Sequence, residues 1–271
     1  MWTVYPMGAT IYYSLCRYDI VSPPRFAGLR NFIYMLHDDK LRIVIGNTLY
    51  FVLLGVPAGL IVAWCLANLL NPQIRFRSVF RMIFFIPTIV PVVVSASVWE
   101  WVYAPIYGLI NSTLTALGVG SIPWLSSPAL AKISLIICHC WAQGAAIVIF
   151  LAALQDVPAS LYDAALVDGA GRWQRFWHVT IPMCTSSILF VFLTSLIGMF
   201  QYFTFGWLLT QGRPNMSTEF YGLYLYRNGF RYFKMGYASA LALLLFLIIV
   251  GFTLLIFRTS ARWVYYGGEA E

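Results

Sequence analysis

Charged residues are scarce in this sequence. They make up 10% of its 271 residues, whereas hydrophobic residues make up 61%. A water-soluble domain carries about 25% charged residues and cannot bury so much apolar surface in one core. The composition excludes an ordinary soluble protein and predicts a protein of the bilayer. Because its apolar runs are long enough for spanning helices, we expect an all-α membrane protein.

Nucleotide-binding and hydrolytic motifs are missing as well. There is no Gly-x-x-x-x-Gly-Lys segment, and Lys40, Lys132 and Lys234, the three lysines, each follow a residue other than glycine. The chain therefore lacks a P-loop for nucleotide phosphates. It also has no His-Glu-x-x-His, no Gly-x-Ser-x-Gly and no paired carboxylates in an apolar stretch. The sequence predicts a protein that is not an enzyme and binds no cofactor of its own.

The cysteines and the positive charges suggest neither a metal site nor a nucleic-acid site. Cys138-His139-Cys140 resembles half of a metal site, but no second Cys or His pair completes a tetrahedral centre. The net charge of +7 comes from Lys and Arg spread over short connecting segments. Without a basic face, we expect no nucleic-acid partner and regard the lipid bilayer as the partner of these charges.

Long apolar runs predict the membrane-spanning helices, since a helix needs ~20 apolar residues to cross a bilayer. The five stretches that qualify are Leu41–Leu70, Val79–Tyr103, Ala129–Leu154, Met183–Leu209 and Gly236–Phe257. A sixth stretch, Trp2–Cys16, covers only ~22 Å and indicates the second half of a helix. A signal peptide is disfavoured there, since a basic start and a small-residue cleavage site are lacking. We expect about six transmembrane helices, the first truncated, in a single domain over residues 1–271.

Ionisable residues inside these stretches are few. They are Glu100, Lys132 and His139, and the first two lie near predicted helix ends. Carriers driven by ion gradients usually place such groups near the middle of the membrane. Energy for any transport is therefore expected to come from another chain.

A polar segment, residues 155–182, interrupts the apolar runs. Pro158 suits the first turn of a helix, with Asp156 in reach as its cap, and Gly169 and Gly171 end that helix. So tight a turn is expected to need a positive φ at Gly169.

A second short helix is predicted from Arg172 to about Val179. Four of its residues are spaced to form one face, namely Trp173, Phe176, Trp177 and Thr180. The first helix instead presents Leu161 and two alanines, which allow close approach of another backbone. Such a helix pair is either an interfacial anchor or is docked into a partner protein.

The segment DAALVDGAGRWQRFWHVTIP (163–182) resembles the EAA loop of ABC-importer permeases. That pattern is roughly Glu-Ala-Ala, Asp-Gly-Ala, an aromatic residue and Ile/Leu-Pro, and the details are similar to the carbohydrate-uptake group. Asp163 stands where the family usually has glutamate, which keeps the charge and shortens the side chain. Weaker similarities follow in the family's order: FAGLRNF (26–32), NTLYFVLLGVPAGL (47–60), WEWVYAPIYGLIN (99–111), FLAALQDVPASLYDAA (150–165), LTQGRP (209–214) and MGYASA (235–240).

The resemblance implies a cytoplasmic loop that docks in a groove of an ATPase subunit. The residues it assigns to this coupling are Leu161, Asp163, Ala164, Ala165, Asp168, Gly169, Ala170, Trp173, Phe176 and Pro182. The implied partners are a second permease, two ATPase subunits that bind ATP and magnesium, and an extracytoplasmic substrate-binding protein. Closure of the ATPases would switch the helices between inward-facing and outward-facing states.

The resemblance also fixes an orientation, in the cell inner membrane with both termini cytoplasmic. Charge counting does not support that orientation. The side that carries the loop holds seven Lys and Arg and the opposite side ten, against the positive-inside rule. The orientation therefore rests on the resemblance.

A sugar or oligosaccharide is the expected cargo, and aromatic faces with amide or hydroxyl groups usually hold sugars. The candidate substrate residues are Trp141, Gln143, Ser195, Gln201, Tyr202 and, between two tryptophans, Glu100. Each has a structural alternative, a hydrogen bond between helices or a place in the interfacial aromatic belt. Two alternative functions also stay open: a permease for a non-sugar cargo such as glycerol phosphate, and a non-transporting membrane subunit that binds an ATPase.

Overall fold

The computed structural model describes residues 2, 4–71 and 76–265. These residues form two compact units, each assembled from three separate parts of the chain. Unit 1 comprises Met1–Val52, Ala96–Leu135 and Ile197–Phe252. Unit 2 comprises Leu53–Ser95, Ile136–Leu196 and Thr253–Glu271.

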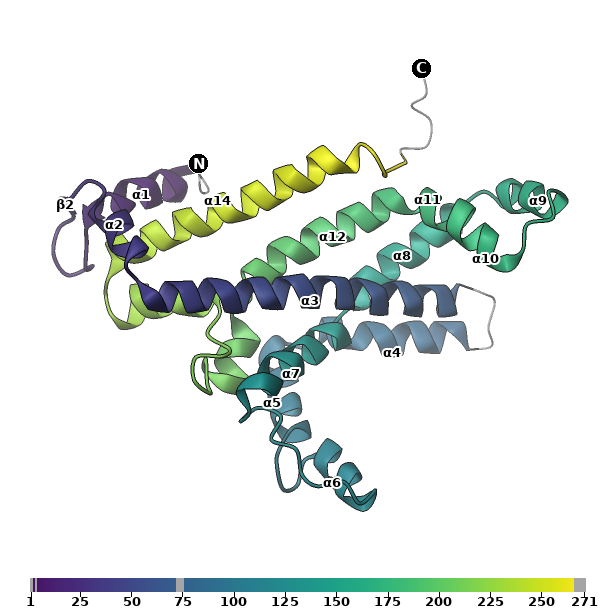
Figure 1. Ribbon diagram of the computed structural model, residues 1–271, viewed down its shortest axis with the longest axis horizontal. Coiled ribbons are helices and arrows are strands. Elements are labelled where there is room, and N and C mark those ends of the chain that lie inside the picture. The colour runs from purple at the N-terminus through teal and green to yellow at the C-terminus, as the bar shows by residue number, and fades with distance from the viewer. Residues whose placement is uncertain (1, 3, 72–75, 266–271) are drawn as a thin grey trace. The chain divides into compact units, whose positions relative to one another are not determined.

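The described part of the chain is predominantly helical (Figure 1), which confirms the all-α prediction. The α-helices of its first half are α1 (Val4–Ser14), α2 (Arg30–Leu36), α3 (Asp39–Leu70), α4 (Arg77–Ile89), α5 (Val92–Val102), α6 (Leu109–Ala116) and α7 (Pro128–Trp141). Those of the second half are α8 (Gly144–Asp156), α9 (Ala159–Val167), α10 (Arg172–Arg175), α11 (Ile181–Met183), α12 (Thr185–Phe200), α13 (Tyr221–Tyr226) and α14 (Met235–Ser260).

Short elements complete the fold. Three π-helical segments occur, η1 (Phe176–Thr180), η2 (Gly206–Thr210) and η3 (Arg227–Arg231). The two-residue strands β1 (Cys16–Arg17) and β2 (Arg25–Phe26) pair antiparallel.

Among the described residues, α3 and α14 are each long and apolar enough to cross a membrane alone. Three further helix pairs pass the same test only if each bent pair is one span, which gives up to five spans. The bends are 102° between α4 and α5, 49° between α7 and α8, and 63° where residues 172–183 meet α12. α1 has 11 residues, in agreement with the short helix expected near the start.

The helices are nevertheless interrupted within the predicted stretches 79–103, 129–154 and 183–209, a feature that the apolar runs did not predict. Pro91 follows Val90, whose backbone is extended at φ −64° and ψ 130°, because a residue before proline avoids the helical region. α8 starts at Gly144, where a Cβ atom would lie 2.3 Å from Thr88 Oγ1 and 2.9 Å from the Phe84 carbonyl oxygen. This close approach lets α4 and α8 pack together within unit 2.

The apolar core of unit 2 forms where the second half of α3 meets α8. Ala63 and Ala67 are completely buried, and Phe150 and Leu154 of α8 join the same cluster. The Trp64 ring packs edge-on against Phe150 with the ring centroids 5.2 Å apart. Small side chains on α3 permit this contact, as is common between membrane helices.

The core of unit 1 combines the first half of α3 with α13 and α14. The Thr48 hydroxyl accepts the backbone N–H of Tyr221 at 2.9 Å, and the Tyr221 hydroxyl donates to the Leu241 carbonyl at 2.8 Å. The Asn47 amide donates to the carbonyl of Met216 at 2.6 Å. Polar side chains of α3 thus hold the loop before α13.

Candidate functional site

Helix α9 ends in a glycine-dependent turn. Gly169 has a φ of +76°, which confirms the expected positive φ. The Gly169 N–H donates to the Leu166 carbonyl at 3.0 Å, and the Ala170 N–H donates to the Ala165 carbonyl at 2.9 Å. Together these bonds form a Schellman motif, which favours glycine at the left-handed position. The turn sets the direction in which the chain leaves α9.

The start of α9 differs from expectation. Pro158 is its N-cap, and no side-chain hydrogen bond caps the helix, so the prediction that Asp156 caps it is wrong. Asp156 is instead the last residue of α8. α8 therefore runs to within three residues of α9.

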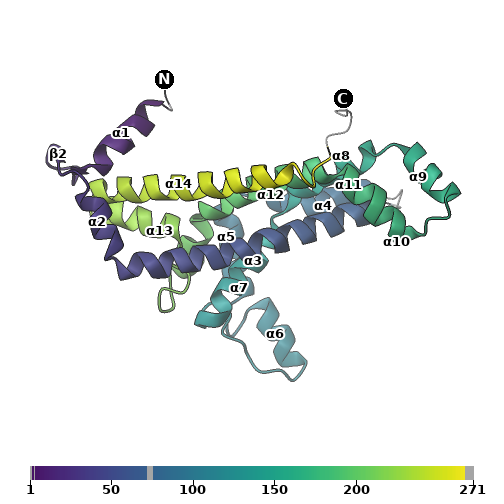
Figure 2. The ribbon, with the colours of Figure 1, turned by 45° about the horizontal axis from the view of Figure 1, so that its top comes forward.

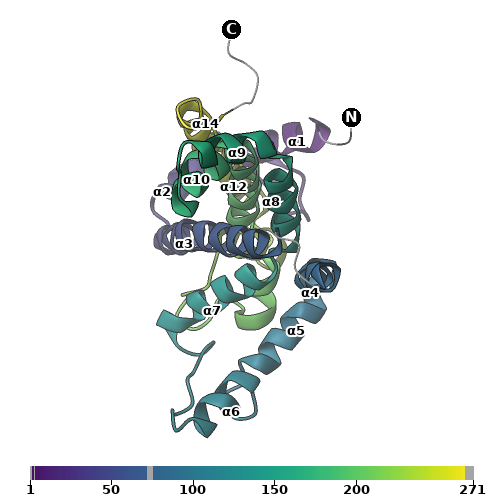
Figure 3. The ribbon, with the colours of Figure 1, turned by 90° about the vertical axis from the view of Figure 1, so that its right-hand side faces the viewer.

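The two short helices α9 and α10 lie together at one end of unit 2 (Figures 2 and 3). Leu161, Asp163 and Ala164 are exposed on α9. A hollow of about 390 Å³ between α9 and the following helical segment brings together several predicted coupling residues. Its lining comprises Ala165, Asp168, Gly169, Ala170, Gln174, Arg175, His178 and Val179.

The helix after the turn is longer than predicted. α10, η1 and α11 follow one another without a break up to Met183, and Pro182 lies within α11. The Gly171 N–H donates to the Gln174 side-chain oxygen at 2.7 Å, which satisfies one free donor at the start of α10. Pro182 therefore lies inside a helical segment rather than after its end.

The predicted four-residue face of this helix is only partly correct. Trp173, Phe176 and Thr180 line one groove, but Trp177 is not part of its lining. Thr180 is buried and its hydroxyl lies 2.9 Å from the Tyr162 hydroxyl. The π-helical hydrogen bonding of residues 176–180 explains the change, because each π turn contains more residues than an α turn.

That groove, which we call the α3–α10 groove, has a volume of about 800 Å³ and lies entirely in unit 2. It runs between the last turns of α3 and the segments around α9 and α10. Its lining residues are Trp64, Cys65, Asn68, Leu69, Tyr162, Arg172, Trp173, Arg175, Phe176 and Thr180.

Three of the predicted substrate residues belong to unit 2. Trp141 is the last residue of α7 and is 39% exposed. Gln143 is buried before α8, where its amide donates to the His139 carbonyl at 3.0 Å and lies 3.0 Å from the His139 ring nitrogen. Ser195 is half-buried on α12. Gln143 thus has a structural role at the break between α7 and α8.

The other three predicted substrate residues belong to unit 1. The Tyr202 ring packs against the rings of Phe51 and Phe220, at centroid distances of 4.5 Å and 5.6 Å. Gln201 is exposed just after α12, and Glu100 is exposed on α5. Tyr202 is the one of these three that is anchored in an aromatic cluster.

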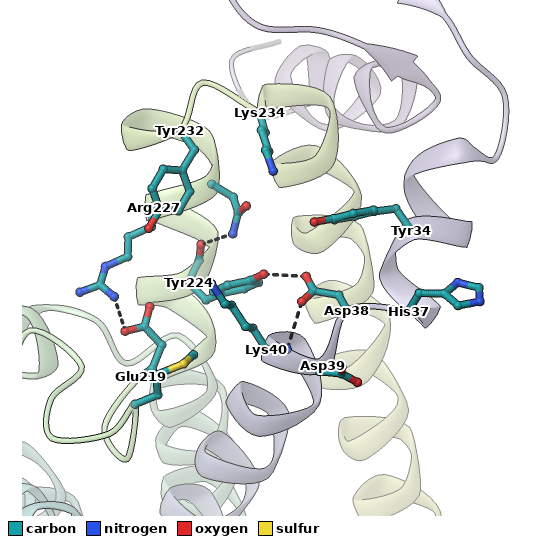
Figure 4. A pocket seen from close by; sticks show the side chains of 12 residues that line it. Tyr34, His37, Asp38, Asp39, Lys40, Glu219, Tyr224, Arg227, Tyr232 and Lys234 are labelled. Atoms are coloured by element: carbon teal, nitrogen blue, oxygen red, sulfur yellow. Dashed lines mark hydrogen bonds and ion pairs between the residues drawn. The ribbon is translucent and has the colours of Figure 1, made fainter.

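A polar cavity of about 380 Å³ in unit 1 was not predicted (Figure 4). We call it the Asp38 cavity; it is lined by Tyr34, His37, Asp38, Asp39, Lys40, Met216, Glu219, Tyr224, Arg227, Asn228, Tyr232 and Lys234. These residues come from the junction of α2 with α3 and from the segment around α13. Carboxylates, cations and tyrosines are present in similar numbers.

Asp38 is the most highly bonded side chain in this cavity. It is 8% exposed, and the hydroxyls of Tyr224 and Tyr237 each donate to its carboxylate at 2.6 Å. The backbone N–H groups of Lys40 and Leu41 also donate to it, at 3.1 Å and 3.3 Å, as at a helix N-cap. Burial tends to raise the pKa of Asp38, but these hydrogen bonds outweigh burial and lower the pKa.

Glu219 and Arg227 form the second polar pair of the cavity. Glu219 is 1% exposed, and Arg227 donates to its carboxylate at 2.6 Å. Burial raises the pKa of Glu219, and the charge and hydrogen bond of Arg227 offset only part of that rise. The pair ties the loop before α13 to η3.

Comparison with known proteins assigns the chain to a family. Residues 55–263 match the model of the binding-protein-dependent transport system inner membrane component. The chain belongs to this family. It is the membrane permease of an ABC transporter, as the resemblance of its loop implies.

Several relatives align with this permease over most of their length. The probable ABC transporter permease protein YesP of Bacillus subtilis is 36% identical, with 99% of this chain and 88% of YesP covered. The trehalose/maltose transport system permease protein MalF of Thermococcus litoralis is 31% identical, with 95% of this chain and 88% of MalF covered. A crystal structure of a bacterial ABC transporter involved in alginate import has the same fold, with a TM-score of 0.82, 22% identity and coverage of 97% and 90%.

In this permease, sequence reasoning did not identify Asp38, Tyr224 or the pair Glu219–Arg227. One signal was present, since Asp38 directly precedes a long apolar run, where an N-cap is expected. Its tyrosine partners follow 186 and 199 residues later, and no local pattern links residues so far apart.

Proposed function

We propose that this permease imports a sugar or an oligosaccharide as one membrane subunit of an ATP-driven importer. Relatives named as trehalose/maltose and lactose permeases support the cargo, at 31% and 33% identity over 95% and 87% of the chain. Two ATPase subunits that bind ATP and magnesium, a second permease and an extracytoplasmic binding protein complete the importer. Both units of the chain form one permease domain, with both termini on the cytoplasmic side of the cell inner membrane.

The observation that carries the coupling proposal is the α9 turn. α9 presents Leu161, Asp163 and Ala164 on an exposed surface, while the Schellman motif at Gly169 sets where the chain continues. A groove of the ATPase subunit receives this surface. Because α10, η1 and α11 lead into α12 without a long loop, movement of α9 is transmitted to a membrane helix.

ATP binding supplies the free energy by favouring one of two arrangements of the helices. Closure of the ATPases draws the docked α9 helices together and opens the permease to the outside. The loaded binding protein then releases its sugar into the permease. Trp141, Gln143, Ser195, Gln201, Tyr202 and Glu100 are the residues we propose as sugar contacts.

The cargo is tested with the importer purified from cells that co-express all of its subunits. A panel of sugars, with glycerol phosphate for comparison, is offered to the binding protein, and stimulated ATP hydrolysis is measured in proteoliposomes. We expect one sugar to stimulate hydrolysis and to accumulate inside. Stimulation by glycerol phosphate alone would contradict the sugar assignment, and hydrolysis without the ATPase subunit would contradict the assigned energy source.

The sugar contacts are tested by single alanine substitutions, read as uptake by importers that still assemble. Tyr202→Ala and Ser195→Ala are expected to lower uptake at least severalfold. Thr194→Ala is a matched control, because Thr194 is exposed on α12 and its hydroxyl donates to the Phe190 carbonyl. If all six proposed contacts tolerate alanine at unchanged uptake, the sugar is bound elsewhere, and the partner permease is the next place to look.

A further inference from the structure

The α3–α10 groove lies where a membrane headgroup layer is expected. The 32 residues of α3 extend ~48 Å at 1.5 Å per residue. A bilayer is ~30 Å thick in its hydrocarbon and ~40–45 Å with its headgroups. Both ends of α3 therefore reach headgroup depth. Trp64, Cys65, Asn68 and Leu69, which line the groove, lie in the last two turns of this helix.

Two arginines in the groove have no anionic partner in the part of the chain that the structure describes. Neither Arg172 nor Arg175 forms a salt bridge among the residues that the structure describes. In addition, the Nε atom of Arg175 and the indole nitrogen of Trp64 are buried with no hydrogen-bond acceptor among the described residues. Buried N–H groups nearly always have an acceptor. The groove thus combines two positive charges with two unsatisfied donors.

The remaining walls are apolar and exposed. Trp173 is 75% exposed and Leu69 is 67% exposed, and Phe176 packs edge-on against Trp173 at a centroid distance of 6.1 Å. Aromatic side chains of this kind are enriched at membrane interfaces. Free inorganic phosphate would satisfy the arginines but would leave these walls in water.

We propose that the α3–α10 groove binds an anionic phospholipid from the membrane leaflet that surrounds this end of α3. The lipid phosphate accepts hydrogen bonds from Arg172, Arg175 and Trp64, because guanidinium groups pair well with phosphate oxygens. The part of an acyl chain next to the headgroup covers Trp173 and Leu69. The groove volume of about 800 Å³ accommodates the phosphate and this part of the chain. The lipid thereby joins the end of α3 to the start of α10, next to the coupling turn.

This proposal does not rest on the sugar assignment and uses the side of α10 that faces α3. The exposed surface of α9 stays available to an ATPase. A competing occupant is an acidic segment of the ATPase itself, which would also neutralise the arginines. Exposed apolar side chains of the groove at this end of α3, Cys65 and Leu69, favour the phospholipid.

Native mass spectrometry of the full-length chain in detergent tests the proposal. Dioleoyl phosphatidylglycerol is titrated against dioleoyl phosphatidylcholine, and bound lipid is counted. We expect one phosphatidylglycerol site that phosphatidylcholine does not fill. The Arg172→Gln/Arg175→Gln variant should bind it about 25-fold more weakly, since each basic residue near a membrane surface contributes roughly fivefold.

The Arg258→Gln/Arg262→Gln variant is a matched control. It likewise removes two arginines from unit 2, both of them exposed, but neither lines the groove. Its affinity for phosphatidylglycerol should therefore change less than threefold. Trp64→Phe keeps an aromatic ring and loses only the donor, and should weaken binding severalfold. If the double variant does not fold, Arg172→Gln alone replaces an exposed side chain and should weaken binding about fivefold.

Three results would overturn the proposal. The first is equal phosphatidylglycerol binding by the groove variant and the parent. The second is displacement of the lipid by glycerol 1-phosphate at the same concentration, which would indicate a site for free phosphate. The third is no lipid selectivity in the parent; loss of the ATPase subunit from the groove variant would then assign the groove to an acidic protein segment.

Discussion

Replacing Asp38 with alanine should destabilise unit 1 by about 4 kcal/mol. The substitution removes two hydrogen bonds of 2.6 Å from Tyr224 and Tyr237 and leaves both hydroxyls without this acceptor. Hydrogen bonds to a charged group contribute ~1.5–3 kcal/mol each, and an N-cap contributes ~1 kcal/mol. Relief from burying a charge offsets part of that sum.

The neighbouring carboxylate provides the matched control. Asp39 is 88% exposed in its side chain and pairs with Arg42 at 3.4 Å. Surface pairs of this type contribute ~0–1 kcal/mol. Thermal unfolding of the purified chain should therefore show a melting temperature lower by about 10 °C for Asp38→Ala, at ~2–4 °C per kcal/mol, and nearly unchanged for Asp39→Ala.

The pH dependence of this difference has a defined sign. The pKa of Asp38 is lowered in the folded state, so its contribution to the free energy of unfolding is complete above the unfolded pKa of ~3.9. That contribution is lost as the pH falls through the lower folded pKa. The difference in melting temperature between Asp38→Ala and Asp39→Ala should be constant from pH 6 to 8 and should become smaller below pH ~4. Equal melting temperatures of the two variants at pH 7 would refute the role of Asp38.

Two further substitutions test buried polar contacts. Arg227→Met leaves the buried Glu219 carboxylate without its ion-pair partner and should cost ~3–5 kcal/mol of stability. Because the pKa of Glu219 is already raised, the loss in thermal stability should be larger at pH 8 than at pH 5. Arg231 is exposed, so Arg231→Met should show no such difference between the two pH values. Asn111→Ala removes a 1% exposed side chain that bonds to four different residues, with its oxygen accepting the Ile122 N–H at 3.0 Å. It should cost ~3 kcal/mol and make residues 104–127 sensitive to chymotrypsin at a concentration that leaves the parent intact.

The sequence predicted the location of the membrane segments and of the coupling turn because both depend on local patterns. The apolar run from Leu41 matches α3, and the glycine that was expected to need a positive φ has one, at Gly169. Hydrophobicity over ~20 residues identifies a span whatever its neighbours are. A Schellman motif is likewise a local device that glycine favours.

The breaks within the spans could not be predicted in this way. The bend at Pro91 had a local signal in the proline, but apolar content alone does not distinguish a straight span from a bent one. The break before Gly144 depends on the close approach of Thr88 from another helix. The π-helical segment Phe176–Thr180, whose Trp177 is not part of the groove lining, likewise has no signal in the spacing of apolar residues.

The Asp38 cavity was not predicted for a related reason. Its hydrogen bonds join the start of α3 to residues of α13 and α14 that lie far along the chain. The predicted sugar contacts were selected by residue type alone. The structure assigns three of them to each unit, and Gln143 has an additional bond to His139 that residue type did not indicate.

The coupling role of the α9 turn is the central claim of this account, and a matched pair of glycines tests it most directly. Gly169 and Gly118 have φ values of +76° and +78°, and no atom lies within 4 Å of a Cβ built on either one. Valine should therefore impose similar backbone strain, of roughly 1–2 kcal/mol, at both positions. Only Gly169 lies in the coupling turn, because Gly118 belongs to unit 1 after α6.

The measurement is the amount of ATPase subunit that stays with each variant on washing, together with the stimulation of ATP hydrolysis by loaded binding protein. Gly169→Val is predicted to insert in the membrane normally but to lose the ATPase subunit, or to hydrolyse ATP without a response to the binding protein. Gly118→Val should retain both the subunit and the response. If Gly169→Val keeps its ATPase and responds like Gly118→Val, the turn does not couple the permease to ATP hydrolysis, and α9 and α10 serve instead as an interfacial anchor.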